Sequence, residues 1–394
     1  AKSIEITVWH GLAGDAKKAF EQLCDEFNAS QDKVKVKPTF VVFVEMARKI
    51  DTAIAAGAPP DVAILGVAYP PRLIAANVLT PIDDLATPEQ MADIKSDLYS
   101  TYLDFLTKGG KLWSVPAGGG CMVLYYNKDM FAAAGLDPDV PPQTWDDVVR
   151  FGKKLTNPAK NQWGFRVYSI NADWLLSQYL PMLWQNGGEF LNADNTAAAF
   201  NSPEGVETLQ FLVDAVHKHK ISPLVSLEFT QAAGLFQTGT IGMMMHMETL
   251  YGGFQSLSFK WGVAPLPQVK KRATWIGGWY PVIFKGSRNQ DAAWQFVHWL
   301  TKDAQIAWSK GIGTTPARKS VVQSPPYQQY LVEHPKRAAF VEGNKYGRFK
   351  PAIPEYEAIS KIFTAEAEKA LYQKVSVKQA LDDAAAKVNE ILRK

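Results

Sequence analysis

The chain has 394 residues, more than one hydrophobic core usually supports, because domains cluster at roughly 100 to 200 residues. Its composition, 47% hydrophobic and 21% charged with 28 glycines and 24 prolines, is typical of a globular protein and excludes a disordered or fibrous chain. The 42 Lys and Arg residues against 39 Asp and Glu leave a formal charge of +3, too small to indicate nucleic acid or an anionic membrane as the main partner.

The first hundred residues alternate strand and helix patterns. Residues 4–9, 34–40 and 60–65 are typical of strands, and the segments between them are typical of helices. The first of these helices carries apolar side chains at a spacing of three and four, namely Phe20, Leu23, Cys24 and Phe27. This order predicts an open, largely parallel sheet in a three-layer α/β lobe, with ligands at the carboxyl ends of the strands. His10, Phe43 and Tyr69 are therefore expected near one crevice.

The second half continues the alternation without repeating the sequence. Strand patterns cover 122–126 and 164–167, and helix patterns cover 174–184, 203–219, 291–302 and 375–393. No period of 20 to 50 residues appears, which excludes solenoids and propellers. Length and pattern together predict two α/β lobes.

We expect no membrane anchor on this chain. No apolar run approaches the roughly 18 residues that span a bilayer, and no secretory leader pattern is present. The chain starts at Ala1 as a processed protein would, and no cysteine at residue 1 offers a lipid attachment site. Its two cysteines, Cys24 and Cys121, exclude a disulfide framework and have no metal-ligand spacing. We expect buried small hydrophobes there, with a single bridge as the alternative.

Several short segments, in this order, resemble the family of extracellular solute-binding proteins that serve ABC importers. The resemblance lies with the branch that holds the maltose-type and glycerol-3-phosphate-binding proteins. The segments are Val8-Trp9-His10-Gly11, residues 57–62, residues 123–131, residues 135–138 leading to Thr144-Trp145, residues 236–239, Ile276-Gly277-Gly278 and Gly313-Thr314-Thr315-Pro316. Each is weak evidence alone, but together they extend over nearly the whole chain.

The resemblance implies a type II periplasmic-binding-protein fold with a ligand in the cleft between two lobes and hinge closure upon it. Chain crossings are expected near 116–120, 259–263 and 314–318. Each lobe is then discontinuous: residues 1–117 with 262–315 form the first, and residues 118–261 with 316–394 form the second. We further expect a periplasmic monomer that binds a sugar, polyol or glycerol phosphate derivative and meets the importer's transmembrane subunits, with no cofactor, metal or nucleic acid.

A sugar or polyol offers hydroxyl edges that need hydrogen-bond partners and C–H faces that pack on aromatic rings. Candidate rings at strand ends or in Gly-rich turns are Trp9, Phe43, Tyr69, Trp174, Trp275, Trp279 and Tyr280, each with core packing as its alternative role. Trp279 is the foremost candidate, because Gly277 and Gly278 before it allow the backbone to approach a ligand closely.

Two polar features add to these rings. His10 follows the first strand, where imidazole hydrogen-bonds a hydroxyl or, when protonated, meets an anion; a histidine satisfied by its neighbours is the alternative. The run from Gly118 through Gly119 to Gly120 offers backbone N–H groups to an anionic oxygen, or else forms a flexible crossing between the lobes.

Comparison with the glycerol-3-phosphate branch adds candidates by resemblance only. Where that branch has a tyrosine this chain has Val44, and where that branch has an acidic residue this chain has Tyr69. Where that branch has serines before the segment 123–131, this chain has Gly119 and Gly120. A later serine of that branch falls within residues 246–248 of this chain, which makes His246 a candidate. Gly278 is retained, and Arg348 lies close to a phosphate-pairing arginine that would suit an anion by bidentate pairing. The resemblance as a whole supports the ligand class. The departures argue against glycerol 3-phosphate itself as the ligand.

The alternative from another class is a secreted carbohydrate-active hydrolase with paired cleft carboxylates. Asp61, Glu189, Glu248 and Glu355 are available, but nothing in the sequence sets two of them opposite each other. The chain has no Gly-x-Ser-x-Gly elbow, His-Glu-x-x-His motif, Walker loop or Rossmann fingerprint. A protein-binding scaffold would need an exposed apolar stripe, whereas the aromatic residues gather at turns. We therefore expect a binding protein and no enzyme.

Overall fold

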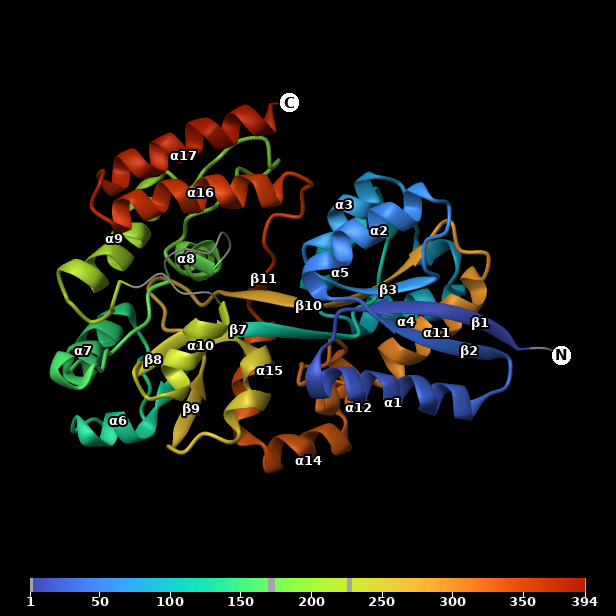
Figure 1. Cartoon of the computed structure of the whole chain (residues 1–394), viewed down its shortest axis with the longest axis horizontal. Coiled ribbons are helices and arrows are strands. Elements are labelled where there is room, and N and C mark those ends of the chain that lie inside the picture. Colours follow the sequence, from blue (N-terminus) through green and yellow to red (C-terminus); the bar gives the residue numbers. More distant parts are fainter. Residues whose placement is uncertain (1–2, 169–173, 225–228, 394) are drawn as a thin grey trace. The chain divides into compact units, whose positions relative to one another are not determined.

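A computed structural model describes residues 3–168, 174–224 and 229–393 of the chain (Figure 1). The chain forms two compact units, each made of two segments. The first unit is Ala1–Gly120 with Gly277–His334, and the second is Cys121–Ile276 with Pro335–Lys394. Strands and helices are mixed in both units, which confirms the predicted α/β class.

The division into units differs from the expected crossings at two of three places. It falls after Gly120, as expected near 116–120, but also after Ile276 and after His334 instead of near 259–263 and 314–318. Two of these divisions lie inside continuous strands, β7 (Gly118–Asn127) and β10 (Thr274–Phe284). A strand that passes from one unit to the next leaves no turn residues for a sequence pattern to mark.

The first unit is built on a sheet in which β1 (Ile4–His10) lies between two parallel neighbours. This strand pairs in parallel with β2 (Val34–Phe40) and with β3 (Val62–Gly66), which confirms the parallel arrangement expected for the first hundred residues. The first-unit part of β10 runs antiparallel to β3, with Trp279 opposite Gly66. The short β4 (Leu79–Thr80) pairs with the end of β10.

Helices cover both faces of this sheet, since βαβ connections place them there. Figure 1 shows α2 (Met46–Ala55) and α3 (Tyr69–Ala75) on one side of the strands and α1 (Gly14–Ser30) on the other. The remaining elements of the unit are η1 (Phe43–Glu45), η2 (Ile82–Asp84), α4 (Pro88–Asp97), α5 (Ser100–Leu106), β5 (Thr107–Lys108), β6 (Lys111–Leu112), α11 (Gln290–Lys302), α12 (Gln305–Ile312), α13 (Lys319–Gln323) and α14 (Pro325–Glu333).

The core on the α2 and α3 side consists of side chains from alternate positions of the strands and from the inner faces of both helices. It contains Val41, Met46, Ile50, Ala63, Leu65, Leu73, Leu79, Val282 and Phe284. Trp9 and Tyr69 are partly buried against this cluster. The core therefore supports the strand ends that carry the aromatic candidates.

The second unit contains the remaining strands. All of β7 is buried, and β7 pairs antiparallel with β8 (Met243–Met247) and with β9 (Trp261–Ala264). The first residues of β10 pair with β11 (Gly347–Arg348). The strand predicted over 164–167 is not a regular strand, because its amides donate to separate segments, Phe165 to Ile221 and Arg166 to Met243.

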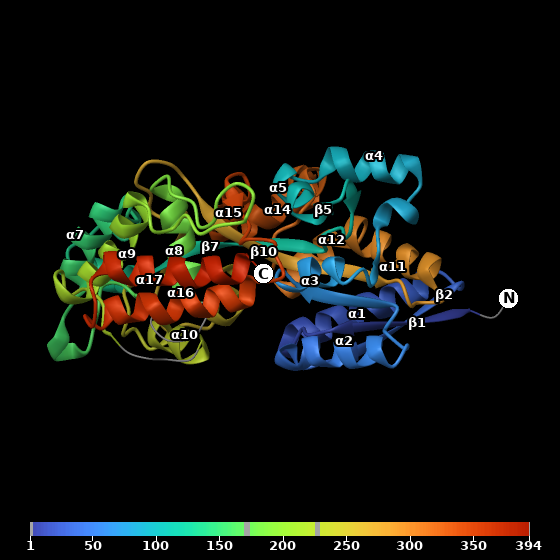
Figure 2. The ribbon, with the colours of Figure 1, turned by 90° about the horizontal axis from the view of Figure 1, so that it is seen from above.

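Helices of the second unit confirm the patterns expected at 174–184, 203–219 and 375–393. They are α6 (Lys128–Ala133), α7 (Trp145–Leu155), η3 (Pro158–Lys160), α8 (Trp174–Gln185), α9 (Pro203–His217), α10 (Phe229–Gln237), η4 (Glu248–Leu250), η5 (Gly252–Phe254), η6 (Pro335–Arg337), α15 (Ala338–Asn344), α16 (Tyr356–Leu371) and α17 (Val377–Leu392). Figure 2 shows α16 and α17 side by side, and both contact α9.

Both cysteines are free and buried, Cys24 in α1 and Cys121 in β7, which confirms the expected role as small hydrophobes. Within the part of the chain that the structure describes, no helix combines the length and the apolar character needed to cross a membrane.

Candidate functional site

Three aromatic side chains meet at one end of the first-unit sheet, and we call them the first-unit cluster: Phe43, Tyr69 and Trp279. Phe43 begins η1 after β2, and Tyr69 begins α3 after β3. Both therefore lie beyond the carboxyl ends of parallel strands, where open α/β sheets bind ligands. Trp279 joins them because the antiparallel register of β10 sets it opposite Gly66, the last residue of β3.

The rings of this cluster are in edge contact. The ring centroids of Phe43 and Tyr69 are 5.8 Å apart and those of Phe43 and Trp279 are 6.1 Å apart, both nearly perpendicular. The Tyr69 hydroxyl donates to the Phe43 carbonyl at 3.2 Å. Phe43 is 44% exposed, and the other two rings are half-buried. An exposed phenyl ring supported by two others can receive the C–H face of a ligand.

Two glycines make room for this arrangement. A Cβ atom at Gly11 would lie 3.1 Å from Cδ2 of Phe43, and one at Gly66 would lie 3.3 Å from its Cζ. Since any side chain at either glycine would crowd the phenyl ring, the loop after β1 and the end of β3 together determine where Phe43 packs. The side chain of Val44, the next residue, lies outside the described part of the chain.

His10 lies on the opposite face of β1 from Trp9, because side chains alternate along a strand. It has no exposed surface and packs against the rings of Phe20 and Phe40, with centroids 4.7 and 5.9 Å away. Burial, with a smaller effect of nearby Lys17, lowers the pKa of His10 to about 4. The expectation that this side chain stands at the crevice does not match its placement in the core.

Tyr280 and Gly278 also have core roles. Tyr280 is fully buried beside Phe105, and burial raises the pKa of its hydroxyl well above the usual value. A Cβ atom at Gly278 would lie 2.7 Å from the Gly118 carbonyl oxygen, so this glycine allows two backbones to meet. Gly277 and Gly278 lie inside β10 and not in the expected Gly-rich turn.

The glycine run 118–120 is the start of β7 and not a flexible linker. The amide of Gly119 donates to the Thr315 carbonyl at 2.8 Å, and the Thr315 amide returns the bond at 2.9 Å. The Gly119 N–H is therefore engaged in a backbone bridge and is not available to an anionic oxygen. Gly120 is buried in the same strand.

The second unit has its own group of rings, which we call the second-unit cluster: Tyr168, Trp174, His246 and Trp275. Trp174 begins α8, and its indole stacks on the His246 imidazole with centroids 4.6 Å apart and planes inclined by 20°. The ring centroids of Tyr168 and Trp275 lie 5.7 and 6.4 Å from that of Trp174, with Tyr168 tilted by 39° and Trp275 edge-on at 74°. Trp174 is half-buried, whereas the other three rings are buried.

Lys350 lies beside this cluster, a position that the sequence pattern does not predict. Its Nζ atom lies 3.7 Å from the Trp275 ring centroid and 2.8 Å from the Ser177 hydroxyl, and the residue is 6% exposed. A cation over an indole face is stabilised by the ring quadrupole. No local pattern distinguishes this lysine from a solvated one, because its partners come from β10 and α8, far away in sequence.

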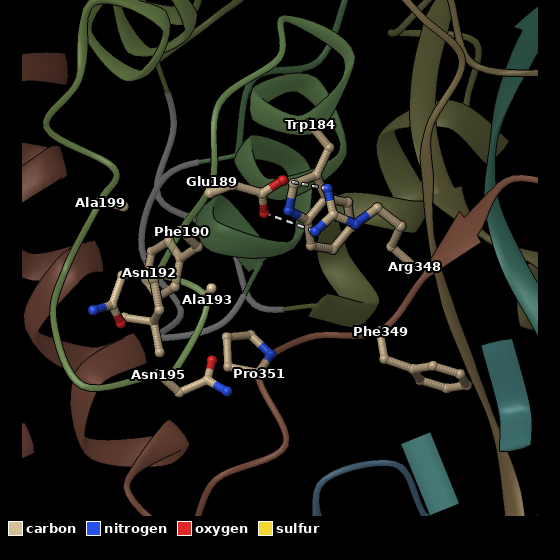
Figure 3. A pocket seen from close by; sticks show the side chains of 11 residues that line it. Trp184, Glu189, Phe190, Asn192, Ala193, Asn195, Ala199, Arg348, Phe349 and Pro351 are labelled. Carbon is tan, nitrogen blue, oxygen red and sulfur yellow. Dashed lines mark hydrogen bonds and ion pairs between the residues drawn. The ribbon is translucent and has the colours of Figure 1, made fainter. Parts of the chain in front are cut away.

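Arg348 has a partner within the second unit and lies at the edge of a pocket (Figure 3). Its guanidinium makes two hydrogen bonds to the Glu189 carboxylate, at 2.9 and 2.7 Å, and covers the Trp184 ring at 4.7 Å. The pocket has a volume of about 600 Å³ and also includes Asn192, Asn195 and Pro351. Because Glu189 occupies the guanidinium fork, the expected pairing with an anionic ligand is not supported by the geometry.

Three of the four carboxylates weighed for a hydrolase have structural partners. Asp61 accepts hydrogen bonds from the amide and hydroxyl of Thr7 and from the Ser287 hydroxyl. Glu248 is buried 3.6 Å from the Arg337 guanidinium, and Glu189 is paired as described. These partners give each of the three carboxylates a structural role.

Comparison with known proteins agrees with the motifs. The model of the family described as bacterial extracellular solute-binding protein matches residues 13–307. The cyclic α-maltosyl-1,6-maltose binding protein of Arthrobacter globiformis is 31% identical, with a TM-score of 0.89 and 99% of each chain covered. A solute binding protein of an ABC transporter from Thermotoga lettingae, solved with α-D-tagatose, is 27% identical with a TM-score of 0.85, over 99% of this chain and 100% of the other.

A curated relative represents the second branch of the resemblance. The sn-glycerol-3-phosphate-binding periplasmic protein of Shigella dysenteriae is 24% identical over 417 residues, which cover 99% of this chain and 92% of the relative. Because the family model covers well over half of the chain, this protein belongs to the family of bacterial extracellular solute-binding proteins.

Proposed function

We propose that this chain is the periplasmic substrate-binding component of an ABC importer. It captures a carbohydrate or polyol-type solute and delivers it unchanged to the transmembrane subunits, as a monomer and without a cofactor. Family membership supports the role, and the first-unit cluster supports the ligand class.

The observation that carries the proposal is the exposed ring of Phe43, held in edge contact with Tyr69 and Trp279 beyond the strand ends. Pyranose C–H faces pack on such rings, and the surrounding hydroxyl and indole N–H groups offer hydrogen bonds to a sugar edge. Trp174, half-buried in the second unit, is the corresponding surface there.

Within this class a neutral sugar is favoured over a glycerol phosphate derivative. The anion-binding groups expected from the sequence have other partners, since Glu189 holds Arg348 and the Thr315 carbonyl holds the Gly119 amide. Burial lowers the pKa of His10 to about 4 and that of His246 to about 3, so neither is a cation near neutral pH. The solved structures from Arthrobacter globiformis and Thermotoga lettingae, at 31% and 27% identity, are named for saccharide ligands.

The mechanism we propose is ligand-dependent closure. A solute that contacts both the first-unit cluster and Trp174 binds the closed arrangement more tightly than the open one, and this differential affinity shifts the population. The importer then recognises the closed form. Support for this step comes from the family's repertoire of hinge closure.

The test is a calorimetric titration with cyclic α-maltosyl-1,6-maltose, maltotriose, D-tagatose and sn-glycerol 3-phosphate, followed by mass spectrometry of the recovered solute. We expect saturable binding of at least one saccharide, weaker or absent binding of sn-glycerol 3-phosphate, and an unchanged solute. Steady formation of a product would show an enzyme, and tight binding of the phosphate alone would overturn the preference for a neutral ligand.

A further inference from the structure

His246 is the most deeply buried member of the second-unit cluster, and it lies directly against the ring of Trp174. The two rings are 4.6 Å apart and nearly parallel, with an angle of 20° between their planes. His246 has no exposed surface, whereas Trp174 is half-buried. The imidazole therefore occupies the inner face of the indole and leaves contact with a ligand to other surfaces of Trp174.

The backbone holds the imidazole in place. His246 lies in β8, where it is opposite Val123 of the buried strand β7. The Met247 amide donates a hydrogen bond to Nδ1 of His246 at 2.8 Å, which requires that Nδ1 carries no proton. Burial lowers the pKa of His246 to about 3, so the ring is a neutral acceptor at Nδ1 near neutral pH. One ring of the stacked pair is thus anchored in the sheet.

Trp174 stands at the N-terminal end of its helix. It is the first residue of α8, where the first four backbone N–H groups lack partners within the helix. A side chain at a helix end depends on its neighbours for a defined rotamer. Its ring contacts include Tyr168, His246 and the edge of Trp275, and the His246 imidazole stacks on the indole face.

We propose that His246 is a positioning residue for ligand capture: its imidazole sets the plane of the Trp174 indole without touching the solute. This inference rests on the proposed function, because it assigns Trp174 to the ligand-contacting surface of the second unit. A ring fixed before binding loses less conformational freedom when the ligand arrives, and affinity rises accordingly.

Two variants separate the ring of His246 from its hydrogen bond. In His246→Phe an aromatic ring still stacks on Trp174, but no acceptor faces the Met247 amide. In His246→Asn the side-chain oxygen can accept from that amide, but the stack is lost. We expect His246→Phe to bind cyclic α-maltosyl-1,6-maltose within about twofold of wild type and His246→Asn to bind about 3- to 10-fold more weakly, since aromatic pairs contribute on this scale.

The same substitutions in a Trp174→Ala background provide the matched control. A residue that acts through Trp174 loses its influence there, so Trp174→Ala and the double variant Trp174→Ala/His246→Asn should bind equally. Equal affinity of wild type and His246→Asn would overturn the proposal. So would a loss of affinity from His246→Asn that is as large in the Trp174→Ala background as in wild type. A loss in His246→Phe as large as in His246→Asn would indicate direct contact with the solute instead.

A second measurement does not require a ligand. In protein labelled with 5-fluorotryptophan, the resonance of Trp174 is assigned by its disappearance in Trp174→Phe. We expect this resonance to shift and broaden in His246→Asn and to stay sharp in His246→Phe, while the other indole resonances stay in place. An unmoved Trp174 resonance in His246→Asn would reject the positioning role even if the wild type bound no saccharide, and absent binding would count against the proposed function alone.

Discussion

At the scale of single residues, the direction of a side chain decides its role more than its place in the chain. Trp9 and His10 are adjacent in β1, yet Trp9 packs on the α2 and α3 side and His10 packs against Phe20 of α1. Phe43 and Tyr69, predicted near the same crevice, are in contact in the structure. Strand alternation separates the histidine from these rings.

Trp279 provides the first prediction at this scale. Replacement by alanine should weaken saccharide binding by about 1 to 3 kcal/mol, because the indole offers an apolar face and supports Phe43. Calorimetric titration measures the loss. Trp163, half-buried in the second unit beyond both clusters, serves as the control, and Trp163→Ala should bind like wild type. Unchanged affinity in Trp279→Ala would remove this ring from the site.

Gly119 provides the second prediction. A Cβ atom there would lie 1.6 Å from the Tyr102 hydroxyl oxygen and 2.7 Å from its Cζ. Gly119→Ala should therefore lower the free energy of unfolding by about 1 to 3 kcal/mol, the usual cost of overpacking. Removal of the hydroxyl in Tyr102→Phe should recover part of this loss in the double variant, as urea denaturation would reveal. Full stability of Gly119→Ala would contradict the packing.

At the scale of elements, β10 shows that two adjacent glycines do not always mark a turn. Ile276-Gly277-Gly278 is typical of a turn, but the strand runs on through both glycines. At Gly278 the missing side chain allows close approach to the Gly118 carbonyl oxygen. The strand pairs with β3 at one end and β11 at the other, each within its own unit. Trp275 and Trp279 thereby serve different clusters from one strand.

The ion pair between β11 and the segment that follows α8 leads to a prediction about ligand charge. Arg348 and Glu189 are 38% and 48% exposed, and such pairs contribute about 0 to 1 kcal/mol to stability. Arg348→Ala should therefore cost little stability and leave affinity for both cyclic α-maltosyl-1,6-maltose and sn-glycerol 3-phosphate within about twofold. Glu189→Gln is the matched control. A specific loss of phosphate binding in Arg348→Ala would show that the arginine leaves Glu189 for an anion.

At the scale of the whole molecule, each unit has a buried histidine whose protonation opposes folding. Burial lowers the pKa of His10 to about 4 and that of His246 to about 3, whereas both titrate near 6.5 in the unfolded chain. Below pH 6.5 the unfolded chain binds protons that the folded chain excludes. Stability is therefore complete above pH 6.5 and falls as the pH drops towards these lowered values.

The size of this effect can be measured by urea denaturation at pH 7 and pH 5. Each histidine should contribute a loss of up to about 2 kcal/mol between pH 6.5 and pH 5, from about 1.4 kcal/mol per pH unit. His10→Phe removes a ring whose nitrogens make no hydrogen bond within the described residues, so it should reduce the loss without a large cost at pH 7. An unaltered pH dependence in His10→Phe would contradict the lowered pKa.

Ligand-dependent closure is the last prediction at this scale. We expect cyclic α-maltosyl-1,6-maltose to reduce the radius of gyration measured by small-angle X-ray scattering, because the proposed closure makes the molecule more compact. Trp279→Ala at the same saccharide concentration should show a smaller change, in proportion to its lower occupancy. Identical scattering with and without a solute that calorimetry shows to be bound would exclude closure.

The sequence by itself determined the local elements and the family. Strand and helix periods at 4–9, 34–40 and 174–184 depend on near neighbours, and the family motifs are short runs whose order is visible without coordinates. For the same reason the aromatic candidates at strand ends could be named, and Phe43, Tyr69 and Trp279 do lie together.

Only the tertiary structure decided which partner each of these side chains has. Glu189 and Arg348 are 159 residues apart, and Lys350 and Ser177 are 173 apart, so no local pattern predicts either contact. Burial of His10 and the continuity of β10 through Gly277 likewise depend on which face of a strand a distant helix or backbone covers. Contacts between residues far apart in sequence depend on the complete fold. The periodicity of a helix or strand depends only on residues a few positions apart.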